Sequence, residues 1–570
     1  MENNILKIIK RVFPLVVFLL IVQTDICFGF KKGFIIPVEK LVIDALDPIY
    51  AQVKPGDTLH FISGKKLFLN IKNFKGKSGS PIVLINSGGE VIIDTDNYYG
   101  ISIENCQFIK FTGTGFPGKF YGFTILRVLN GAGMGIGYLS SDIEVDHVSI
   151  ENTLIGGLYF KTDPDCSNGS VRGTFTQYNT VIHDNYIANV GNEGMYIGST
   201  KFSGQVVSCN GKDTLLMPSL LDGVRIYNNI VKYAGWDGIQ VSSASKNCQI
   251  YNNTVLYDSQ SKVDTQMSGI ILGGGTKADC YNNYIAFGNG DGIECHGLGG
   301  TRIFNNIIVE PGLTFFPNDK TKPKHGMYIA DTSVQLDSAF YIMNNDIVRP
   351  KSDGIRFTSV VSKGNYIVGN VIIDPGNFTY YENGNTGSRG IDSYIMFASP
   401  PRATTVTNNY EARDANSAGF QNKNLLIPAD FYLVIGSPLI DAEDYYAKTF
   451  VSYDFFYHTR PYGLKSDLGA FEYNGTTSSL PAKSYSQTNQ SILFQNPVTN
   501  LLRVSIPLLS DTLVFEVFDF KGSIVKQSTQ SRLENGRSLY EINVSDLASG
   551  VYLYSIRSKR NFYSGKFIKL

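Results

Sequence analysis

The chain has 570 residues, 50 of them basic and 50 acidic, so its formal net charge is zero. Charged side chains make up only 18% of the sequence, and residues 30–474 are mildly acidic, with 36 basic and 42 acidic side chains. Because binding to phosphates needs clustered Lys and Arg, this balance argues against nucleic acid as a partner.

Residues 1–29 have the layout of a signal peptide. A basic start at residues 7–11 precedes an apolar core, residues 12–22, which is too short to span a bilayer comfortably. Small residues follow, and cleavage near Gly29 is expected. No other stretch is long and apolar enough to cross a membrane, so we expect an exported mature chain without a transmembrane anchor.

Residues 53–59, Val-Lys-Pro-Gly-Asp-Thr-Leu, open the main body of the chain. They resemble the segment that leads from a cap into the first strand of many β-helix polysaccharide lyases, including the chondroitinase-B-like members of the pectate-lyase-like superfamily. Residues 81–85 and 100–103 resemble the first coils of the same group. The resemblance implies that fold. The basic pair and the calcium site of those lyases cannot be matched residue by residue, so no lyase residue is carried over and calcium stays a possible cofactor.

Two short motifs recur from residue 180 to residue 410. The first is a pair of Asn residues after a short alternating strand, at 228–229, 252–253, 282–283, 305–306, 344–345 and 408–409. The second is a Gly followed by an apolar residue, at 238–239, 269–270, 292–293, 326–327, 354–355 and 390–391. A repeat of about 20–40 residues indicates stacked units that share one core. The sequence therefore predicts an all-β fold, a right-handed parallel β-helix.

Each motif has a physical reason. Asn at one turn position of successive coils can pass amide hydrogen bonds along the stack, as in other side-chain ladders. Gly before the apolar residue is expected to allow a bend with positive φ that a β-carbon would resist.

The end of the solenoid has its own pattern. Residues 436–442, Arg460-Pro461 and residues 467–473 resemble the closing segment of many secreted bacterial β-helix proteins. A solenoid needs such a cap because its last coil would otherwise expose the core and a strand edge. We therefore assign residues 30–473 to the β-helix with its two caps, and interpret the closing residues as structural.

Residues 474–493 are a polar linker, and residues 494–570 form a second domain. Its motifs, at residues 496–498, 513–522, 546–552 and 566–570, closely resemble those of the type IX secretion sorting domain. The resemblance implies a small β-sandwich that engages the type IX secretion machinery, with the body then released or attached to the cell surface. The alternative is a generic β-sandwich binding module.

The cysteines suit an exported chain. Cys280 and Cys295 fall at inward positions of their coils, where we expect core thiols. Cys166 and Cys209 lie in two irregular excursions, residues 162–176 and 199–222, which leave adjacent coils and could bring the two thiols together as a disulfide. No His or Cys spacing resembles a zinc site.

Candidate site residues follow from the Gly motif. The residues just before and two after each Gly should face outward, and successive coils lie about 4.8 Å apart. The first column is Glu193, Asp237, Ser268, Asp291, His325, Asp353 and Arg389, and the second is Tyr196, Gln240, Ile271, Glu294, Tyr328, Arg356 and Asp392. Loops 257–267, 310–324 and 374–388 could wall a groove beside them.

The densest part of these columns is the predicted catalytic centre. It comprises Asp291, Glu294, His325, Asp353 and Arg356, and the expected sugar-binding residues around it are Tyr196, Asp237, Gln240, His296, Tyr328, Arg389, Asp392 and Tyr394. Hydrolysis with inversion would use Asp291 and Asp353 as a carboxyl pair about 6.5–9.5 Å apart. Elimination would use Arg356 to neutralise a uronate and His325 or Tyr328 to take the proton.

Two functions stay open from the sequence. The chain is expected to be a secreted or surface-attached monomer that acts on an extracellular polysaccharide as a lyase or glycoside hydrolase. The alternative is a non-catalytic adhesin or polysaccharide-binding protein that presents a long, flat face.

Overall fold

The structure is a computed structural model. It describes residues 33–116, 119–312, 322–376, 394–443, 451–473, 492–493, 498–507, 514–519, 524–529, 531–534, 537–548, 550–557 and 562–569. The expected signal peptide, residues 1–29, lies outside the described residues, as does most of the expected linker.

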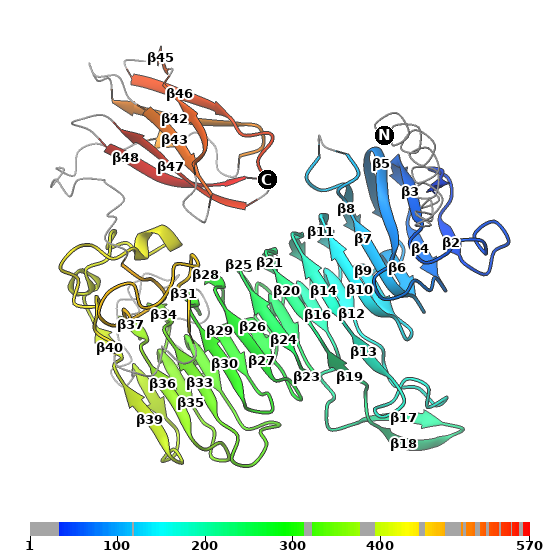
Figure 1. Cartoon of the computed structure of the whole chain (residues 1–570), viewed down its shortest axis with the longest axis horizontal. Coiled ribbons are helices and arrows are strands. Elements are labelled where there is room, and N and C mark those ends of the chain that lie inside the picture. Colours follow the sequence, from blue (N-terminus) through cyan, green and yellow to red (C-terminus); the bar gives the residue numbers. More distant parts are fainter. Residues whose placement is uncertain are drawn as a thin grey trace, which may run out of the picture.

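The main body is a right-handed parallel β-helix, as predicted, whose coils stack side by side (Figure 1). One face of the coils is a 12-stranded parallel sheet. Its strands are β2 (Val42–Asp44), β4 (Leu69–Lys72), β6 (Tyr99–Glu104), β9 (Ala132–Gly137), β12 (Leu158–Phe160), β16 (Met195–Ile197), β22 (Ile239–Val241), β26 (Ser268–Leu272), β29 (Asp291–Cys295), β32 (Met327–Ile329), β35 (Ile355–Phe357) and β38 (Ile395–Phe397).

The other faces are two rows of parallel strands joined in one 23-stranded sheet. The first row is β1 (Gly33–Ile36), β3 (Thr58–Lys66), β5 (Ile82–Thr95), β7 (Gln107–Thr112), β10 (Ser141–Asp146), β14 (Thr180–His183), β20 (Arg225–Tyr227), β24 (Cys248–Tyr251), β27 (Ala278–Tyr281), β30 (Thr301–Phe304), β33 (Phe340–Met343), β36 (Asn365–Val368) and β39 (Thr404–Thr407). The second is β8 (Phe123–Val128), β11 (Val148–Thr153), β15 (Tyr186–Val190), β21 (Ile230–Ala234), β25 (Thr254–Leu256), β28 (Tyr284–Ala286), β31 (Ile307–Val309), β34 (Asp346–Val348), β37 (Val371–Ile373) and β40 (Tyr410–Ala412).

A ladder of Asn side chains runs along the turn between these two rows, as predicted. One Asn per coil is buried there, except for the partly buried last one, and each amide nitrogen donates to the amide oxygen of the next coil's Asn at 2.9–3.0 Å. The ladder comprises Asn185, Asn229, Asn253, Asn283, Asn306, Asn345, Asn370 and Asn409. These bonds satisfy buried amides that the turn removes from water.

The reason predicted for the recurrent glycines is wrong. Gly238, Gly292 and Gly326 do not have positive φ. They stand instead where the coils approach most closely: a β-carbon on Gly292 would lie 2.5 Å from the carbonyl oxygen of Gly326 and 2.4 Å from the Ile308 side chain. Gly is required by this close backbone approach and not by its torsional freedom.

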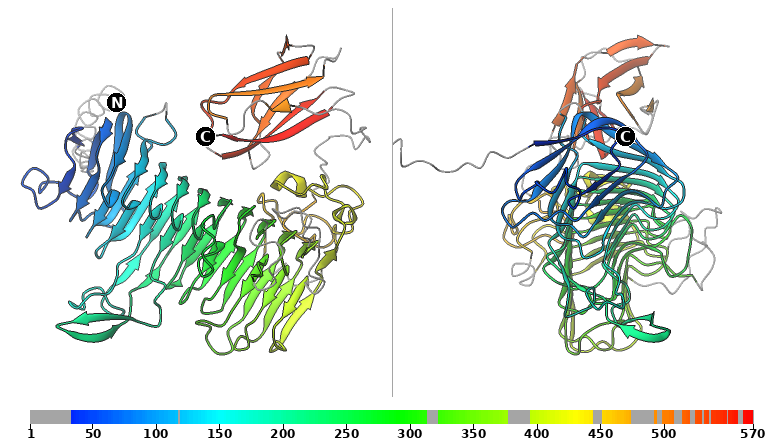
Figure 2. Two further views of the ribbon diagram at one scale, coloured as in Figure 1. Left: turned by 180° about the vertical axis from the view of Figure 1, so that it is seen from behind. Right: turned by 90° about the vertical axis from the view of Figure 1, so that its right-hand side faces the viewer.

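Inside the coils, alternate residues of the strands form one long apolar core. Ile293 and the thiols of Cys280 and Cys295 are fully buried in it, as predicted. The expected pairing of the two excursion cysteines is also confirmed, by a Cys166–Cys209 disulfide. Cys209 ends β17 (Gln205–Cys209), which with β18 (Lys212–Leu216) forms a hairpin that projects from the side of the stack (Figures 1 and 2). A short sheet of β13 (Thr176–Tyr178), β19 (Leu220–Asp222) and β23 (Ala244–Lys246) lies at its base.

The closing segment packs against the last coils, with the 3-10 turns η2 (Ala415–Ala418) and η3 (Pro428–Phe431) before it. Phe455 and Phe471 contribute to a second apolar cluster there. Arg460 is fully buried and contacts the Glu472 carboxylate at 3.0 Å and two backbone carbonyls. These contacts support the structural role predicted for residues 436–473.

The C-terminal domain consists of two four-stranded antiparallel sheets around a core of its own. One sheet contains β41 (Ile492–Leu493), β42 (Leu501–Pro507), β46 (Arg537–Asn543) and β45 (Ser531–Glu534), and the other contains β44 (Ile524–Ser528), β43 (Val514–Phe518), β47 (Gly550–Arg557) and β48 (Phe562–Lys569). This is the predicted β-sandwich. Across the described ranges, the structure has no helix that is long and apolar enough to span a membrane.

Candidate functional site

The predicted site lies on the outer face of the 12-stranded sheet. One outward residue per strand aligns through the strand registers in a line that we call the outer row. From the N-terminal coils onward, it contains Ser102, Gly135, Tyr159, Tyr196, Gln240, Ile271, Glu294, Tyr328, Arg356 and Met396. The predicted alignment from Tyr196 to Arg356 is confirmed.

The prediction for the next coil is wrong in its register. It placed Asp392 beside Arg356, but the strand pairing puts Met396 there and gives Tyr394 the position of the recurrent glycines. The slip arose because a Gly-Ile pair four residues earlier has the same appearance as the true strand start. Tyr394 packs against the core cluster and not into a groove. Arg389 and Asp392 lie outside the described residues.

The residues just before the glycines form a second line, which we call the support column. It contains Glu193, Asp237, Ser268, Asp291, His325 and Asp353. The prediction that this line faces solvent is wrong, because each of these residues is at most 5% exposed. Groups of the adjacent coil lie against them, as the contacts of Asp291 with the Lys324 ammonium and the His325 backbone N–H show. Of the two lines, the outer row is the more exposed among the described residues, although Gly135 and Gln240 within it are buried.

Asp291 ties its own coil to the next one. Its Oδ2 lies 2.9 Å from the Lys324 ammonium, and its Oδ1 accepts a hydrogen bond of 2.6 Å from the His325 backbone N–H. Burial disfavours the ammonium charge, but the attraction of Asp291, assisted by Glu294, outweighs it and raises the pKa of Lys324. Asp291 is therefore an ion-paired carboxylate that anchors a neighbouring segment.

Asp353 contacts the Arg356 guanidinium and the His325 ring from the support side. Its carboxylate lies 3.1 Å from an Arg356 guanidinium nitrogen and 3.2 Å from Nδ1 of His325. The Arg356 side chain is 31% exposed, while Asp353 is almost fully buried. Within the described part of the chain, Arg356 makes no other hydrogen bond. The guanidinium is thus fixed from behind and free to bind an anion at its outer edge.

Tyr328 stands between Glu294 and Arg356 in the outer row. Its ring stacks on His325, with centroids 5.9 Å apart and planes 17° apart, and meets the ring of His296 edge-on at 6.1 Å. No described residue forms a hydrogen bond with the Tyr328 hydroxyl. The ring is held in place on two sides, and its hydroxyl is available to a ligand.

Glu294 and His296 form a dyad beside Tyr328. Glu294 Oε1 lies 2.5 Å from His296 Nε2, and Glu294 Oε2 accepts a hydrogen bond from Ser268. His296 Nδ1 is 2.8 Å from the Thr332 hydroxyl. Burial raises the pKa of Glu294, but His296 more than compensates and the net pKa is lowered. The His296 ring is thus held between the Glu294 carboxylate and the Thr332 hydroxyl.

Asp237 is a buried carboxyl in the middle of the support column. Both of its oxygens are buried, and no described residue forms a hydrogen bond with either. Burial, together with the nearby charges of Glu294 and Glu193, raises its pKa well above the usual range. The surroundings of Asp237 thus disfavour the charged carboxylate.

The face does not fit the calcium ion that was considered from the sequence. Calcium takes six to eight oxygen ligands at about 2.3–2.6 Å. Among the described residues, no three His, Cys, Asp or Glu side chains of the outer row or support column converge within 4.8 Å. We therefore assign no chemistry on this face to calcium.

A hollow of about 400 Å³ at the N-terminal end of the outer row was not predicted. Tyr99, Gly135 and Tyr159 line it, with Lys161 held between the Asp163 carboxylate at 3.0 Å and the Tyr196 ring at 4.8 Å. A β-carbon on Gly135 would lie 2.6 Å from the Tyr99 ring. An outward glycine in a strand is the sequence signal that could have revealed the hollow.

Known proteins resemble two parts of the chain. Residues 493–570 match the family model of the secretion system C-terminal sorting domain. The β-sandwich is thus the sorting signal of a secretion system. No curated protein matches the sequence.

Several solved structures resemble the β-helix at low identity. Pectate lyase Pel9A is 14% identical over 78% of this chain and 98% of its own, with a TM-score of 0.34. The A-module of the Azotobacter vinelandii mannuronan C-5 epimerase AlgE4 is 12% identical over 63% of this chain and 87% of its own, with a TM-score of 0.37. XylC in complex with xylose is 9% identical over 76% of this chain and 98% of its own, with a TM-score of 0.37. The parallel strand pairing itself establishes the fold.

Proposed function

We propose that this protein is an exported polysaccharide lyase that acts on a uronate-containing polysaccharide at Tyr328 and Arg356. One observation carries the proposal: a partly exposed guanidinium, fixed by a buried carboxylate, stands one coil from a tyrosine hydroxyl that no described residue bonds. An anionic sugar unit bound by Arg356 would lie within reach of that hydroxyl, because neighbouring strands are about 4.8 Å apart.

The side chains suit an elimination. Arg356 pairs with the substrate carboxylate and stabilises the charge that develops next to it. The Tyr328 oxygen, after its own proton has passed to solvent, takes the proton from the carbon beside the carboxylate, and the electron pair left behind forms the carbon–carbon double bond. The bond to the leaving sugar oxygen breaks, and His296, held by Glu294, gives that oxygen a proton. His325 and Asp353 position Tyr328 and Arg356.

The geometry favours elimination over hydrolysis. Inverting hydrolysis needs two carboxyl groups that reach the substrate, one of which carries a proton. Asp291 and Asp353 are both buried and both contact a cationic side chain. In the proposed mechanism they are positioning residues and do not transfer protons.

The test is a screen of the full chain on uronate polysaccharides such as pectate and alginate, with detection of both unsaturated products and reducing ends. Elimination predicts both signals in equal amounts. Arg356→Gln should lower turnover at least 100-fold, while Arg402→Gln, at a half-exposed Arg–Asp pair elsewhere, should leave it unchanged. Reducing ends without unsaturated product would contradict the proposal.

The second candidate function is sugar binding without catalysis. The hollow lined by Tyr99 and Tyr159 supports it, because it offers aromatic rings and Lys161 to a sugar. Binding of an acidic polysaccharide without any turnover, abolished by Tyr159→Ala and Lys161→Ala, would favour this candidate and exclude the lyase.

Export through a type IX machinery is the other half of the proposal, supported by the match of residues 493–570. We expect removal of residues 494–570 to leave the β-helix folded but retained in the periplasm of a host with that system, because the two domains have separate cores. Normal amounts of truncated chain at the surface or in the medium would contradict this assignment.

A further inference from the structure

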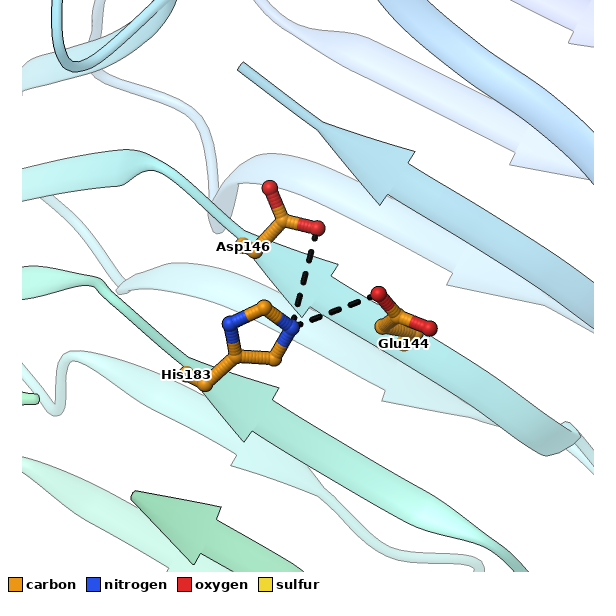
Figure 3. A group of neighbouring side chains, drawn as sticks. All are labelled: Glu144, Asp146 and His183. Atoms are coloured by element: carbon orange, nitrogen blue, oxygen red, sulfur yellow. Dashed lines mark hydrogen bonds and ion pairs between the residues drawn. The ribbon is translucent and has the colours of Figure 1, made fainter. Parts of the chain in front are cut away.

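A second cluster of charged side chains lies on the outer face of the 23-stranded sheet, away from the outer row. Glu144 and Asp146 are alternate residues of β10 and so share one face, and Asp146 pairs in register with His183 of β14. Figure 3 shows the three side chains pointing toward one another. We propose that Glu144, Asp146 and His183 form a binding site for a divalent transition-metal ion, best matched by zinc.

The distances fit one shared ion. His183 Nε2 lies 3.3 Å from Glu144 Oε1 and 3.8 Å from Asp146 Oδ2, and the three atoms are within 4.8 Å of one another. Zinc binds imidazole nitrogen and carboxylate oxygen at about 2.0–2.2 Å, so its ligand atoms are about 3.4 Å apart in tetrahedral geometry. Small side-chain rotations would bring all three atoms to bonding distance.

Neighbouring groups already orient two of the ligands. His183 Nδ1 is 2.6 Å from the Asp184 carboxylate, and its ring stacks on Tyr227 with centroids 4.6 Å apart. This carboxylate–histidine pair leaves Nε2 pointing into the cluster, as in many metal sites. Asp146 Oδ1 accepts a hydrogen bond from Thr112 and lies 2.6 Å from His147.

The second oxygen of Asp146 is the independent observation that points to a cation. Asp146 is 1% exposed, and its buried Oδ2, which faces His183, makes ion-pair contacts but no hydrogen bond of good geometry with any described residue. A buried carboxylate oxygen in this state requires a positive charge. In this structure the Lys110 ammonium partly supplies it, in contact with Glu144 and 3.2 Å from Asp146 Oδ2.

Lys110 is the competing cation, and it does not complete the charge balance. Three carboxylates, those of Glu144, Asp146 and Asp184, surround the Lys110 ammonium and two imidazoles, those of His183 and His147. The Lys110 side chain is 35% exposed and can move into solvent when a divalent ion enters. The mixed imidazole and carboxylate set suits zinc better than calcium, which prefers oxygen alone.

Metal binding to the full chain tests this site, after treatment with a chelator and removal of the chelator. Calorimetric titration with Zn²⁺ should show one tight site per chain, at least tenfold tighter than binding of Ca²⁺. His183→Gln should weaken zinc at least tenfold. His458→Gln, a histidine that likewise contacts a carboxylate at 3.0 Å, is the matched control and should change nothing.

Lys110→Gln separates a metal site from a plain ion-pair network. If the ammonium only competes with the ion, this variant should bind zinc at least as tightly as the natural chain, and zinc should raise its melting temperature more. If Lys110 is simply the counterion, the variant should melt lower and zinc should not restore it. That result, or equal zinc binding by His183→Gln, would overturn the proposal. Glu144→Gln, at a half-exposed position, replaces His183→Gln if the latter does not fold.

Discussion

The Asn turn and the outer row are built from the same coils, yet they differ in how residues repeat. At the turn, eight coils in succession carry the same side chain, and seven identical amide-to-amide hydrogen bonds join them. In the outer row, the residue changes from coil to coil, from tyrosine to glutamate to arginine. The same backbone spacing supports both lines.

This difference in repetition distinguishes positions that stabilise the coils from positions that serve function. A solenoid is stabilised when each coil offers its neighbour an identical partner, so selection for stability favours repetition. Differing polar and charged groups at Glu294, Tyr328 and Arg356 serve no such stacking. A binding or catalytic site needs such a set of different groups, held in place by a regular scaffold.

The largest effect on stability is expected for a residue that points into the core, in comparison with a residue of the outer row. Ile293→Ala should lower the free energy of unfolding by about 2–5 kcal/mol, because a cavity in the stacked core cannot collapse. Ile271→Ala, the same change at a half-exposed outer-row position, should cost less than about 1 kcal/mol. Chemical denaturation measures both, and equal losses would reverse the assignment of inside and outside.

The next prediction breaks the ladder. Asn283→Ala removes hydrogen bonds to Asn253, Ile250 and Asn306 and leaves buried partners unpaired. Each such group costs about 1–3 kcal/mol, so we expect a loss of about 3 kcal/mol in unfolding free energy. The exposed Asn424→Ala should have almost no effect. A ladder variant as stable as this control would show that repetition at the turn does not stabilise the coils.

A smaller effect concerns how the free energy of unfolding depends on pH. It compares the ion-paired Asp291 with Asp346, a residue of β34 that lies against the closing segment. Burial raises the pKa of Asp346 to about 8, and burial likewise raises that of Glu443 to about 7. The folded chain then holds more protons than the unfolded chain, so this contribution to stability is complete below about pH 4 and is lost as the pH rises through about 8. Thermal melting should show this decline, and Asp346→Asn should flatten it while Asp291→Asn does not. An unchanged slope in Asp346→Asn would contradict this account.

The sequence predicted the repeating parts of the molecule well. Spacing alone aligned Tyr196 through Arg356 correctly, because the Asn ladder and the glycines keep every coil in phase. The same spacing gave the wrong register for the next coil, because the Gly390-Ile391 pair lies four residues before the Tyr394-Ile395 pair that the strand uses.

The burial of Asp291 and Asp353 could not be predicted from alternation within a strand, because the groups that contact them belong to adjacent coils: Lys324 lies against Asp291, and His325 lies against Asp353. Glu144, Asp146 and His183 were missed for a related reason. They lie in coils without the Asn pair, and 37 residues separate the registered partners Asp146 and His183. Contacts between irregular coils depend on the length of each loop, which a repeat does not reveal.

The most direct test of the central claim, that the outer row is functional and the turn is structural, is turnover of the identified polysaccharide by Tyr328→Phe. The variant loses only a hydroxyl that no described residue bonds, so we expect at least a 100-fold fall in kcat with an unchanged melting temperature. Tyr196→Phe makes the same change four coils away in the same row and should keep turnover within a few fold. Full activity in Tyr328→Phe, or an equal fall in both variants, would contradict the account.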